Sequence, residues 1–250
     1  NILIVGCGYV GAAISALYSE KCYVTIIDND DEKVEKISNG ISPINEKHII
    51  EAFAKNIDKI TASKKLEEHL DKTKFDLSFI CLPTDFEQNS SKLDTSIIDK
   101  FIKILVKDGN FPIVIKSTIP IGYTKNQRNA YKTDKILFSP EFLREGSAFQ
   151  DSIKPSRIIL SKNEKYQDSI IKFMKDSTIN SPDCYLMESS EAEASKLFAN
   201  AYLAMRVSFF NELDNFAIQE NFSALDIIKG VSSDNRIGFQ YNNPSFGYGG

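Results

Sequence analysis

The fold of this chain is decided by its first eleven residues, Asn1-Ile2-Leu3-Ile4-Val5-Gly6-Cys7-Gly8-Tyr9-Val10-Gly11. The apolar run from Ile2 to Val5 has the length and composition of a short buried strand. It leads directly into the pattern Gly-x-Gly-x-x-Gly, and the helix-favouring segment Ala12-Ala13-Ile14-Ser15-Ala16-Leu17 follows. A strand, a glycine loop and a helix in this order are typical of an α/β fold that binds a dinucleotide.

Each glycine of this loop has a mechanical role. Gly6 permits the tight turn after the strand, Gly8 lets a pyrophosphate approach bare backbone, and Gly11 lets the helix pack closely on the strand. The start of the helix then offers unpaired N–H groups and the positive end of its dipole to the phosphates. The loop therefore predicts a dinucleotide phosphate site.

An acidic residue follows the second predicted strand. The run Tyr23-Val24-Thr25-Ile26-Ile27 ends in Asp28, 17 residues after Gly11. This is close to the distance at which a carboxylate meets the adenosine ribose hydroxyls, and a carboxylate there repels the 2′-phosphate of NADP. The sequence therefore predicts NAD as the cofactor. Lys33 lies one turn further on, where it fits either a solvated surface lysine or a contact on the adenosine side.

Three later predicted strands end in polar loops that contain proline. In a doubly wound sheet the carboxyl ends of the strands face one crevice, so these loops are expected to line it. A proline at a strand end also serves as a simple terminator, so one such loop alone proves little. The strands and their loops are residues 77–82 with Pro83-Thr84, residues 113–115 with Lys116-Ser117-Thr118-Ile119-Pro120, and residues 136–138 with Ser139-Pro140-Glu141-Phe142-Leu143-Arg144-Glu145-Gly146.

A long helix is predicted from residue 190 to about residue 221, where the chain has no glycine or proline. It opens with the capping-box spacing Ser190-Glu191-Ala192-Glu193. At a rise of about 1.5 Å per residue it would span roughly 45 Å, so we expect it to connect domains or to form a dimer spine. Its apolar middle predicts burial on more than one side.

Two polar residues of that helix, Lys196 and Asn200, share one face because they are four residues apart. One interpretation is a snorkelling lysine beside an asparagine whose hydrogen bonds are satisfied. The other is a pair of donors aimed at a developing oxyanion. The spacing alone favours the first interpretation.

The composition is that of an ordinary globular protein, with 250 residues, 42% of them hydrophobic and 26% charged, which allows one to two domains. The net charge of −4 argues against a nucleic-acid surface, and the strand-sized apolar runs argue against a membrane span. No signal-peptide pattern is recognised. The four cysteines lack metal-like spacing and the two histidines lie in polar helical stretches, so we expect no metal site and a cytoplasmic location.

Six short motifs occur in order along the chain, namely Gly6-Cys7-Gly8-Tyr9-Val10-Gly11, Lys116-Ser117-Thr118-Ile119-Pro120, Ser139-Pro140-Glu141-Phe142-Leu143-Arg144-Glu145-Gly146, Pro155-Ser156-Arg157, Glu193-Ala194-Ser195-Lys196-Leu197-Phe198-Ala199-Asn200 and Phe246-Gly247-Tyr248-Gly249-Gly250. Together they resemble the UDP-glucose 6-dehydrogenase family, within the nucleotide-sugar dehydrogenases. The Pro-Glu-Phe-Leu form of the central loop is similar to the branch that acts on UDP-glucose, and enzymes for N-acetylated UDP-sugars tend to differ there.

The resemblance implies oxidation of UDP-glucose to UDP-glucuronate in two NAD-dependent steps at C6 of the sugar. An alcohol is oxidised to an aldehyde, a cysteine adds to it, a second hydride leaves, and water cleaves the thioester. Covalent capture keeps the reactive aldehyde bound between the two hydride transfers. A homodimer through the central helix and a role in polysaccharide or capsule biosynthesis are further expectations for the intact enzyme.

The resemblance also assigns roles to individual residues. It implies that Lys196 and Asn200 stabilise oxyanions, which reverses the preference from spacing, and that Glu141 and Thr118 position or activate the water. The implied cofactor-binding residues are Gly6, Gly8, Tyr9, Val10, Gly11, Asp28, Lys33, Pro83, Thr84, Ser117, Thr118 and Glu145. The implied substrate-binding residues are Glu141, Phe142, Leu143, Arg144, Glu145, Lys196, Asn200, Arg236 (from across the dimer), Tyr241, Asn242, Asn243, Pro244, Ser245 and Gly249.

One departure from the family concerns the nucleophile. The family's catalytic cysteine comes just after Gly-Tyr-Gly-Gly, and this sequence ends at Gly250. None of Cys7, Cys22, Cys81 and Cys184 lies in a matching motif, so none is expected to replace it. We expect the nucleophile and the family's UDP-binding domain beyond Gly250, and we expect these 250 residues alone to be unable to complete the second oxidation.

The predicted organisation is α/β. A Rossmann-like doubly wound, mostly parallel sheet forms an NAD-binding domain of residues 1–188. A long central helix and a short helical segment form a dimerisation region of residues 189–250, which ends in the substrate loop. Two alternatives stay open: a sister dehydrogenase for UDP-N-acetylmannosamine, UDP-N-acetylglucosamine or GDP-mannose, and a non-catalytic NAD-binding and dimerisation module.

Overall fold

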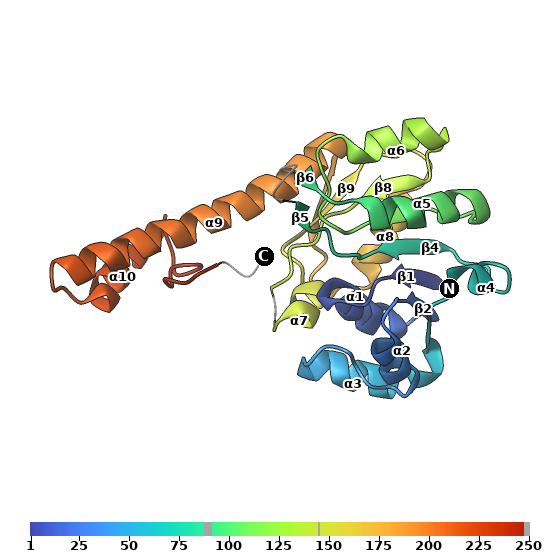
Figure 1. Cartoon of the computed structure of the whole chain (residues 1–250), viewed down its shortest axis with the longest axis horizontal. Helices are drawn as coiled ribbons and strands as arrows, with labels where there is room; N and C mark the ends of the chain where they lie inside the picture. Colours follow the sequence, from blue (N-terminus) through green and yellow to red (C-terminus); the bar gives the residue numbers. More distant parts are fainter. Residues whose placement is uncertain (88–91, 145, 248–250) are drawn as a thin grey trace. The chain divides into compact units, whose positions relative to one another are not determined.

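The structure is a computed structural model that describes residues 1–87, 92–144 and 146–247 (Figure 1). The chain divides into two compact units, Asn1–Ala194 and Ser195–Gly250. The first unit carries the sheet and the glycine loop. The second carries most of the long helix and the chain that follows it. The division at residue 188 stays a prediction.

The first unit is built on a six-stranded parallel sheet in the order β3-β2-β1-β4-β7-β8. The order reverses between β1 and β4, which is the topological switch point where doubly wound folds bind their ligands. This confirms the predicted Rossmann-like sheet. Its strands are β1 (Ile2–Val5), β2 (Val24–Ile27), β3 (Ile60–Ser63), β4 (Leu77–Ile80), β7 (Ile113–Ile115) and β8 (Ile136–Phe138).

Helices cover both faces of this sheet, so it has a hydrophobic core on each side (Figure 1). Neighbouring residues of one strand belong to opposite cores, as Leu3 and Ile4 do, because side chains alternate along a strand. One core is covered by α1 (Tyr9–Ser19), α2 (Asp31–Ser38), α3 (Lys47–Lys55), α7 (Ala148–Ile153) and α8 (Gln167–Asp176), and the other by α4 (Leu66–Leu70), α5 (Ser96–Asp108) and α6 (Tyr123–Tyr131).

Some short elements were not predicted from the sequence. Strand β10 (Asp183–Met187) pairs in parallel with β9 (Arg157–Ser161). Its apolar run from Cys184 to Met187 was not interpreted as a strand, and none of its side chains is fully buried. Helices α6 and α7 bury only two residues each. The remaining elements are the 3₁₀ turn η1 (Ile57–Lys59) and the antiparallel pair β5 (Phe86–Glu87) and β6 (Lys92–Leu93).

Two buried glutamates cap helices that lie far away in sequence. Glu46 accepts hydrogen bonds from the N–H groups of Ala148 and Phe149, both at 2.8 Å, in the first turn of α7. Glu193 accepts from the N–H groups of Gly122 and Thr124 at the start of α6. A carboxylate at these positions satisfies unpaired donors and complements the helix dipole.

The predicted capping box at the start of the long helix is wrong in register. Helix α9 begins at Ser189, and its reciprocal contact is the acceptance of the Glu188 N–H by Glu191 Oε2 at 2.9 Å. Glu193 is unavailable for this role because it caps α6 instead. The sequence spacing was compatible with either arrangement.

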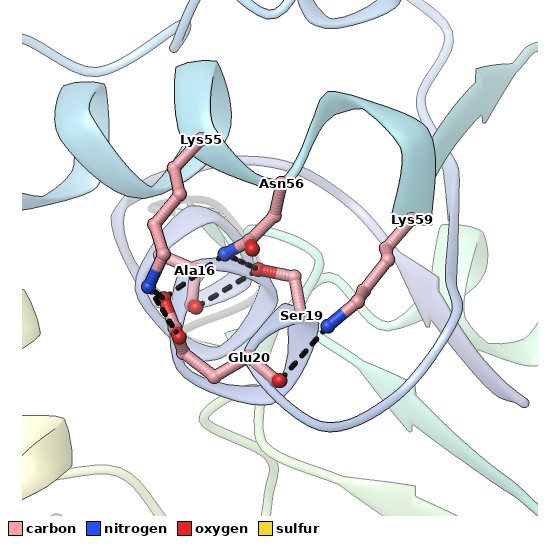
Figure 2. Close-up of polar contacts among 6 residues, drawn as sticks. All are labelled: Ala16, Ser19, Glu20, Lys55, Asn56 and Lys59. Atoms are coloured by element: carbon pink, nitrogen blue, oxygen red, sulfur yellow. Dashed lines mark hydrogen bonds and ion pairs between the residues drawn. The ribbon is translucent and has the colours of Figure 1, made fainter.

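The carboxyl end of α1 is held by side chains from α3 and η1 (Figure 2). Asn56 donates from Nδ2 to Ser19 Oγ at 3.1 Å and to Glu20 Oε1 at 3.0 Å. Lys55 contacts the Glu20 carboxylate at 2.8 Å, and Lys59 donates to the Glu20 carbonyl at 2.9 Å. The chain itself therefore satisfies the polar groups at this end of the helix.

The long helix α9 (Ser189–Gln219) has 31 residues and confirms the predicted central helix. The burial predicted for its apolar middle is not found within the single chain, because Phe198, Tyr202 and Phe209 are 71%, 53% and 57% exposed. Phe210, in contrast, is buried. Among the described residues, no helix combines the length and apolar character that a membrane crossing requires.

Helix α10 (Ala224–Ser232) and a loop complete the second unit. Two residues of α9 hold the loop. Arg206 donates to the carbonyls of Ile237 and Gly238, at 2.9 and 3.3 Å. Asn211 pairs with the main chain of Ser245, donating to its carbonyl and accepting from its N–H, both at 2.8 Å.

Candidate functional site

The glycine loop at the end of β1 is shaped by contacts that exclude side chains at two of its three glycines. Gly6 has a φ of +91°, and a Cβ there would lie 2.7 Å from the carbonyl oxygen of Cys81. A Cβ on Gly11 would lie 1.9 Å from the carbonyl oxygen of Gly6. Neither distance is tolerable for a carbon atom, so both positions require glycine.

Gly8 differs, because a Cβ there would meet nothing within 4 Å. It stands at the start of α1, whose N-terminus has no side-chain cap and no acidic residue in its first turn. Main-chain N–H groups at a helix start that are not capped by the protein form an anion site. The open space over Gly8 and the uncapped helix start therefore fit the pyrophosphate of a dinucleotide.

Asp28 lies at the carboxyl end of β2 and is largely buried. Its Oδ2 accepts the N–H of Cys7 at 2.7 Å, and its Oδ1 accepts the N–H of Asp30 at 3.1 Å. The acid is thus fixed beside the glycine loop, as the predicted ribose contact requires. Lys33 Nζ lies 3.9 Å from Asp28 Oδ2, which places it at the same end of the site.

The two cysteines nearest to this loop are unsuited to nucleophilic chemistry. Burial raises the pKa of the Cys7 thiol, and the negative charge of Asp28 raises it further. Burial also raises the pKa of the Cys81 thiol. Since the thiolate is the reactive form, neither residue is expected to act as the nucleophile.

The loops after β4 and β7 are joined directly. Thr84 Oγ1 donates to the carbonyl oxygen of Thr118 at 2.8 Å, and Ser117 Oγ donates to the carbonyl oxygen of Ile80 at 3.3 Å. Thr84 and Pro83 follow β4, and Ser117 and Thr118 follow β7, so the structure places these four predicted residues at one edge of the sheet.

Glu141 follows β8, the strand next to β7, and forms an ion pair that was not predicted. Its Oε2 lies 2.8 Å from Nζ of Lys116, with side-chain exposures of 16% for the acid and 3% for the lysine. Sequence reasoning quoted Lys116 only as part of a motif. The signal that could have identified it is its position directly after a predicted strand, beside the loop that carries Glu141.

The other predicted residues of the β8 loop have partners within the first unit. The ring of Phe142 lies under the guanidinium of Arg157, with 3.9 Å from the guanidinium carbon to the ring centre. Leu143 packs against the hydrophobic core. Arg144 pairs with Asp151 at 2.6 Å. Glu145 lies outside the described residues.

The remaining predicted substrate residues belong to the second unit. Lys196 and Asn200 are half-buried on α9, one helical turn apart. Asn242 donates to Ser232 Oγ at 2.8 Å, and Arg236 pairs with Asp234 at 2.6 Å. Tyr241 adopts a left-handed backbone with a φ of +55°. The loop continues through Asn243, Pro244 and Ser245, and Gly249 lies outside the described residues.

The structure thus gathers Asp28, Thr84, Thr118 and Glu141 along the carboxyl edge of one sheet in the first unit. Lys196, Asn200 and the loop from Arg236 onward lie in the second unit. Their meeting with Thr118 and Glu141 stays a prediction. The first unit thus offers an uncapped helix start beside a glycine loop, a buried acid held at that loop and, after another strand, a carboxylate paired with a buried lysine.

Comparison with known proteins identifies relatives of both units. Residues 1–176 match the NAD-binding domain of the UDP-glucose/GDP-mannose dehydrogenase family, and residues 190–250 match its central domain. Over its whole length the chain is 44% identical to the UDP-glucose 6-dehydrogenase of Campylobacter jejuni and 39% identical to that of Streptococcus pneumoniae. It covers 64% and 65% of those two proteins.

Solved structures share the fold. The UDP-glucose dehydrogenase of Pyrobaculum islandicum matches with a TM-score of 0.87 at 25% identity, over 100% of this chain and 60% of that one. The GDP-mannose dehydrogenase of Pseudomonas aeruginosa matches with a TM-score of 0.84 at 22% identity, over 94% of this chain and 57% of that one. The chain therefore spans less than two thirds of the length of each of these four relatives.

Proposed function

The chain belongs to the UDP-glucose/GDP-mannose dehydrogenase family, and from that premise we propose that the protein carrying it oxidises UDP-glucose to UDP-glucuronate with NAD. The observation that carries the proposal is the placement of Asp28 and Glu141 at the carboxyl ends of two strands of one parallel sheet. One acid lies beside the glycine loop, and the other pairs with Lys116.

The residues present fit NAD. Gly6, Gly8 and Gly11 leave the start of α1 open to the pyrophosphate, and Asp28 is positioned to accept hydrogen bonds from the adenosine ribose. Lys33, Pro83, Thr84 and Ser117 complete the proposed binding residues in the described chain, together with Tyr9 and Val10 at the helix start. When bound, NAD supplies the acceptor for the hydride that leaves C6 of the sugar.

Glu141 is proposed as the general base, with Thr118 beside it to position the water. In the last step the water oxygen attacks the thioester carbonyl, its proton passes to Glu141, and the cysteine sulfur leaves. Lys196 and Asn200 are proposed to donate hydrogen bonds to the oxyanion that forms at C6. A carboxylate and two donors on separate elements suit a reaction in which a proton leaves while negative charge develops on oxygen.

The loop from Tyr241 to Ser245 is proposed to cradle the UDP-sugar, with Arg236 reaching the substrate of a second subunit. Asn211 supports this assignment because it fixes Ser245 to α9 by two main-chain hydrogen bonds, while Arg206 holds the carbonyls of Ile237 and Gly238 just before the loop. The exposed rings of Phe198, Tyr202 and Phe209 on α9 support a homodimer through this helix. Sedimentation of the protein would measure its oligomeric state.

Two further features of the proposal concern the protein's setting. A cytoplasmic location agrees with four cysteines that form no disulfide in the described chain. We also propose a role in polysaccharide or capsule biosynthesis, which would use UDP-glucuronate. The proposed domain division, residues 1–188 and 189–250, lies close to the boundary between the two compact units.

The experiment is an NADH assay on the complete protein with UDP-glucose, UDP-N-acetylglucosamine, UDP-N-acetylmannosamine and GDP-mannose in parallel. Two NADH for each UDP-glucuronate formed, with UDP-glucose the preferred substrate by kcat/KM, is the expected result. Preference for another sugar would assign the protein to a sister activity. NAD binding without NADH formation from any of the four would leave the non-catalytic module as its function.

A further inference from the structure

We propose that Lys116 is a positioning residue that acts through Glu141: its buried ammonium holds the carboxylate in place and stabilises its negative charge. This inference rests on the proposed function, in which Glu141 is the base. Lys116 was assigned no role in that function, although it contacts the acid directly at 2.8 Å.

The backbone around both residues is fixed by the sheet. The Lys116 N–H donates to the Ile80 carbonyl at 2.9 Å, and the Ser139 N–H donates to the Ile115 carbonyl at 3.0 Å. These bonds extend the pairing of β4 with β7 and of β7 with β8 by one residue at the carboxyl edge. Lys116 therefore reaches Glu141 from a rigid base, and Ser139 Oγ lies 3.5 Å from the same ammonium.

Burial of this lysine is difficult to explain by stability. Only 3% of its side chain is exposed, and removing two charges from water costs more than a simple ion pair usually returns. An apolar side chain of similar volume would serve the core as well. A buried ammonium at the ligand-binding edge of a sheet therefore indicates a role that needs its charge.

Three other groups near Glu141 are Tyr18, Cys81 and Arg157. Tyr18 and Cys81 lie close by, but burial raises the pKa of both, which keeps them neutral. Arg157 lines the same small cavity as Lys116 and Glu141, with its guanidinium over the ring of Phe142. The ion pair of Glu141 with Lys116 is direct, with 2.8 Å between Oε2 and Nζ.

A second Lys–Glu pair in the chain provides a matched control. Lys55 and Glu20 are also 2.8 Å apart, but their side chains are 67% and 40% exposed, at the opposite end of α1 from the glycine loop (Figure 2). The distance is the same and the burial is different. An effect that is special to Lys116 therefore cannot be attributed to loss of a lysine contact as such.

The test compares Lys116→Met and Lys55→Met in the complete protein. We expect Lys116→Met to lower kcat on the order of 100-fold with little change in KM, since a general base contributes roughly that much or more. Lys55→Met should retain the wild-type kcat and KM. A wild-type kcat in Lys116→Met would overturn the inference.

A double variant separates positioning from general damage to the fold. If Lys116 acts through Glu141, then Lys116→Met combined with Glu141→Gln should be no slower than Glu141→Gln alone. Losses that multiply would contradict the proposal. If Lys116→Met does not fold, Lys116→Arg keeps the charge and should keep most of the wild-type kcat. A loss of kcat as large as that of Glu141→Gln would count against the proposal.

The pairing of Lys116 with Glu141 can also be measured separately from any activity on nucleotide sugars. Denaturant unfolding of the wild type, the two single variants and the double variant measures the coupling between Lys116 and Glu141 without any substrate. Coupling in a wild-type protein that oxidises none of the four nucleotide sugars would reject the proposed function and leave the pairing intact. Sugar oxidation without coupling would reject the role of Lys116 alone.

Discussion

The two ends of helix α1 are treated in opposite ways. At its N-terminus the structure shows glycines, no side-chain cap and open space over Gly8. At its C-terminus, Ser19 and Glu20 are bonded by Asn56, Lys55 and Lys59 (Figure 2). This contrast separates a ligand-binding helix end from a structural one. Where the chain satisfies its own polar groups the contact is structural, and where main-chain donors stay uncapped in a shaped space, a ligand is the expected partner.

The largest effect is expected from Gly11→Ala, which would disrupt the packing of the glycine loop against the N-terminus of α1. The new Cβ would lie 1.9 Å from the Gly6 carbonyl, so the helix must shift away from the loop. We expect a loss of about 3 kcal/mol in unfolding free energy, as for severe overpacking. NAD binding should be lost as well. Urea denaturation and calorimetric titration with NAD measure the two effects.

The control for that variant is Gly230→Ala in α10, where a Cβ would meet nothing within 4 Å. Alanine in a helix interior is favoured over glycine by about 0.5–1 kcal/mol, so this variant should be as stable as the wild type or more so. Equal stability of Gly11→Ala and the wild type would show that the loop is not held as described.

The next largest effect is expected from Asn56→Ala, which removes the side-chain hydrogen bonds of Asn56 to the C-terminus of α1. Asn56 is 6% exposed, and its amide bonds both Ser19 and Glu20. Loss of a buried hydrogen-bonding group costs about 1–3 kcal/mol. The midpoint of urea unfolding should fall accordingly, while NAD affinity stays near that of the wild type. Asn39→Ala, on the exposed end of α2, is the matched control and should have a minor effect. A loss of NAD binding in Asn56→Ala would contradict the separation of the two ends.

Gly8→Ala tests the open end without disturbing the fold. Its φ of −81° is allowed for alanine, and no protein atom opposes the new methyl group. The unfolding free energy should therefore be unchanged, and NAD affinity should fall about tenfold, because the methyl group occupies the space proposed for the pyrophosphate. Titration calorimetry gives the affinity. Unaltered NAD affinity would place the pyrophosphate elsewhere.

The smallest effect is expected from Glu20→Gln. Hydrogen bonds from Lys55, and then from Asn56, hold the pKa of the Glu20 carboxyl below its usual value of 4.5. A lowered pKa contributes stability that is present above the usual value and is lost as the pH falls through the lower value of the folded state. At neutral pH the variant should lose less than about 1 kcal/mol, because the pair is exposed to solvent.

Denaturation at a series of pH values checks this last expectation. The wild type and Glu20→Gln should differ at neutral pH and should converge below the usual range of a glutamate. A difference that grows as the pH falls would have the wrong sign. It would show that the Lys55 and Asn56 contacts do not favour the charged carboxylate.

The open end of α1 was predictable from sequence because its requirements are local. Gly6, Gly8 and Gly11 lie within six residues, and Asp28 follows the next strand, so the loop and the sheet could be predicted together. The contact of Thr84 with Thr118 was anticipated only as a shared crevice, since both follow predicted strands. Spacing alone could not tell which strands are neighbours.

The contacts at the C-terminus of α1 and the pair of Lys116 with Glu141 depend on packing between segments that are distant in sequence. Asn56 meets Ser19 across 37 residues, and nothing in either segment indicates the other. Lys116 looked like an ordinary polar residue after a strand, because its burial is created by the β7–β8 pairing and by α1. The predicted role of Glu193 in the capping box of the long helix was wrong for the same reason, since its carboxylate caps α6 instead.

The position of Glu193 in the sequence affects the order of folding during synthesis. The residues of α6 are synthesised about 70 residues before Glu193, the acid that caps this helix. Domains fold as units during synthesis, from the N-terminal side. Until the first turns of α9 are synthesised, the amide groups at the start of α6 therefore lack their carboxylate partner. We expect the first unit to complete its folding only when Glu193 is available.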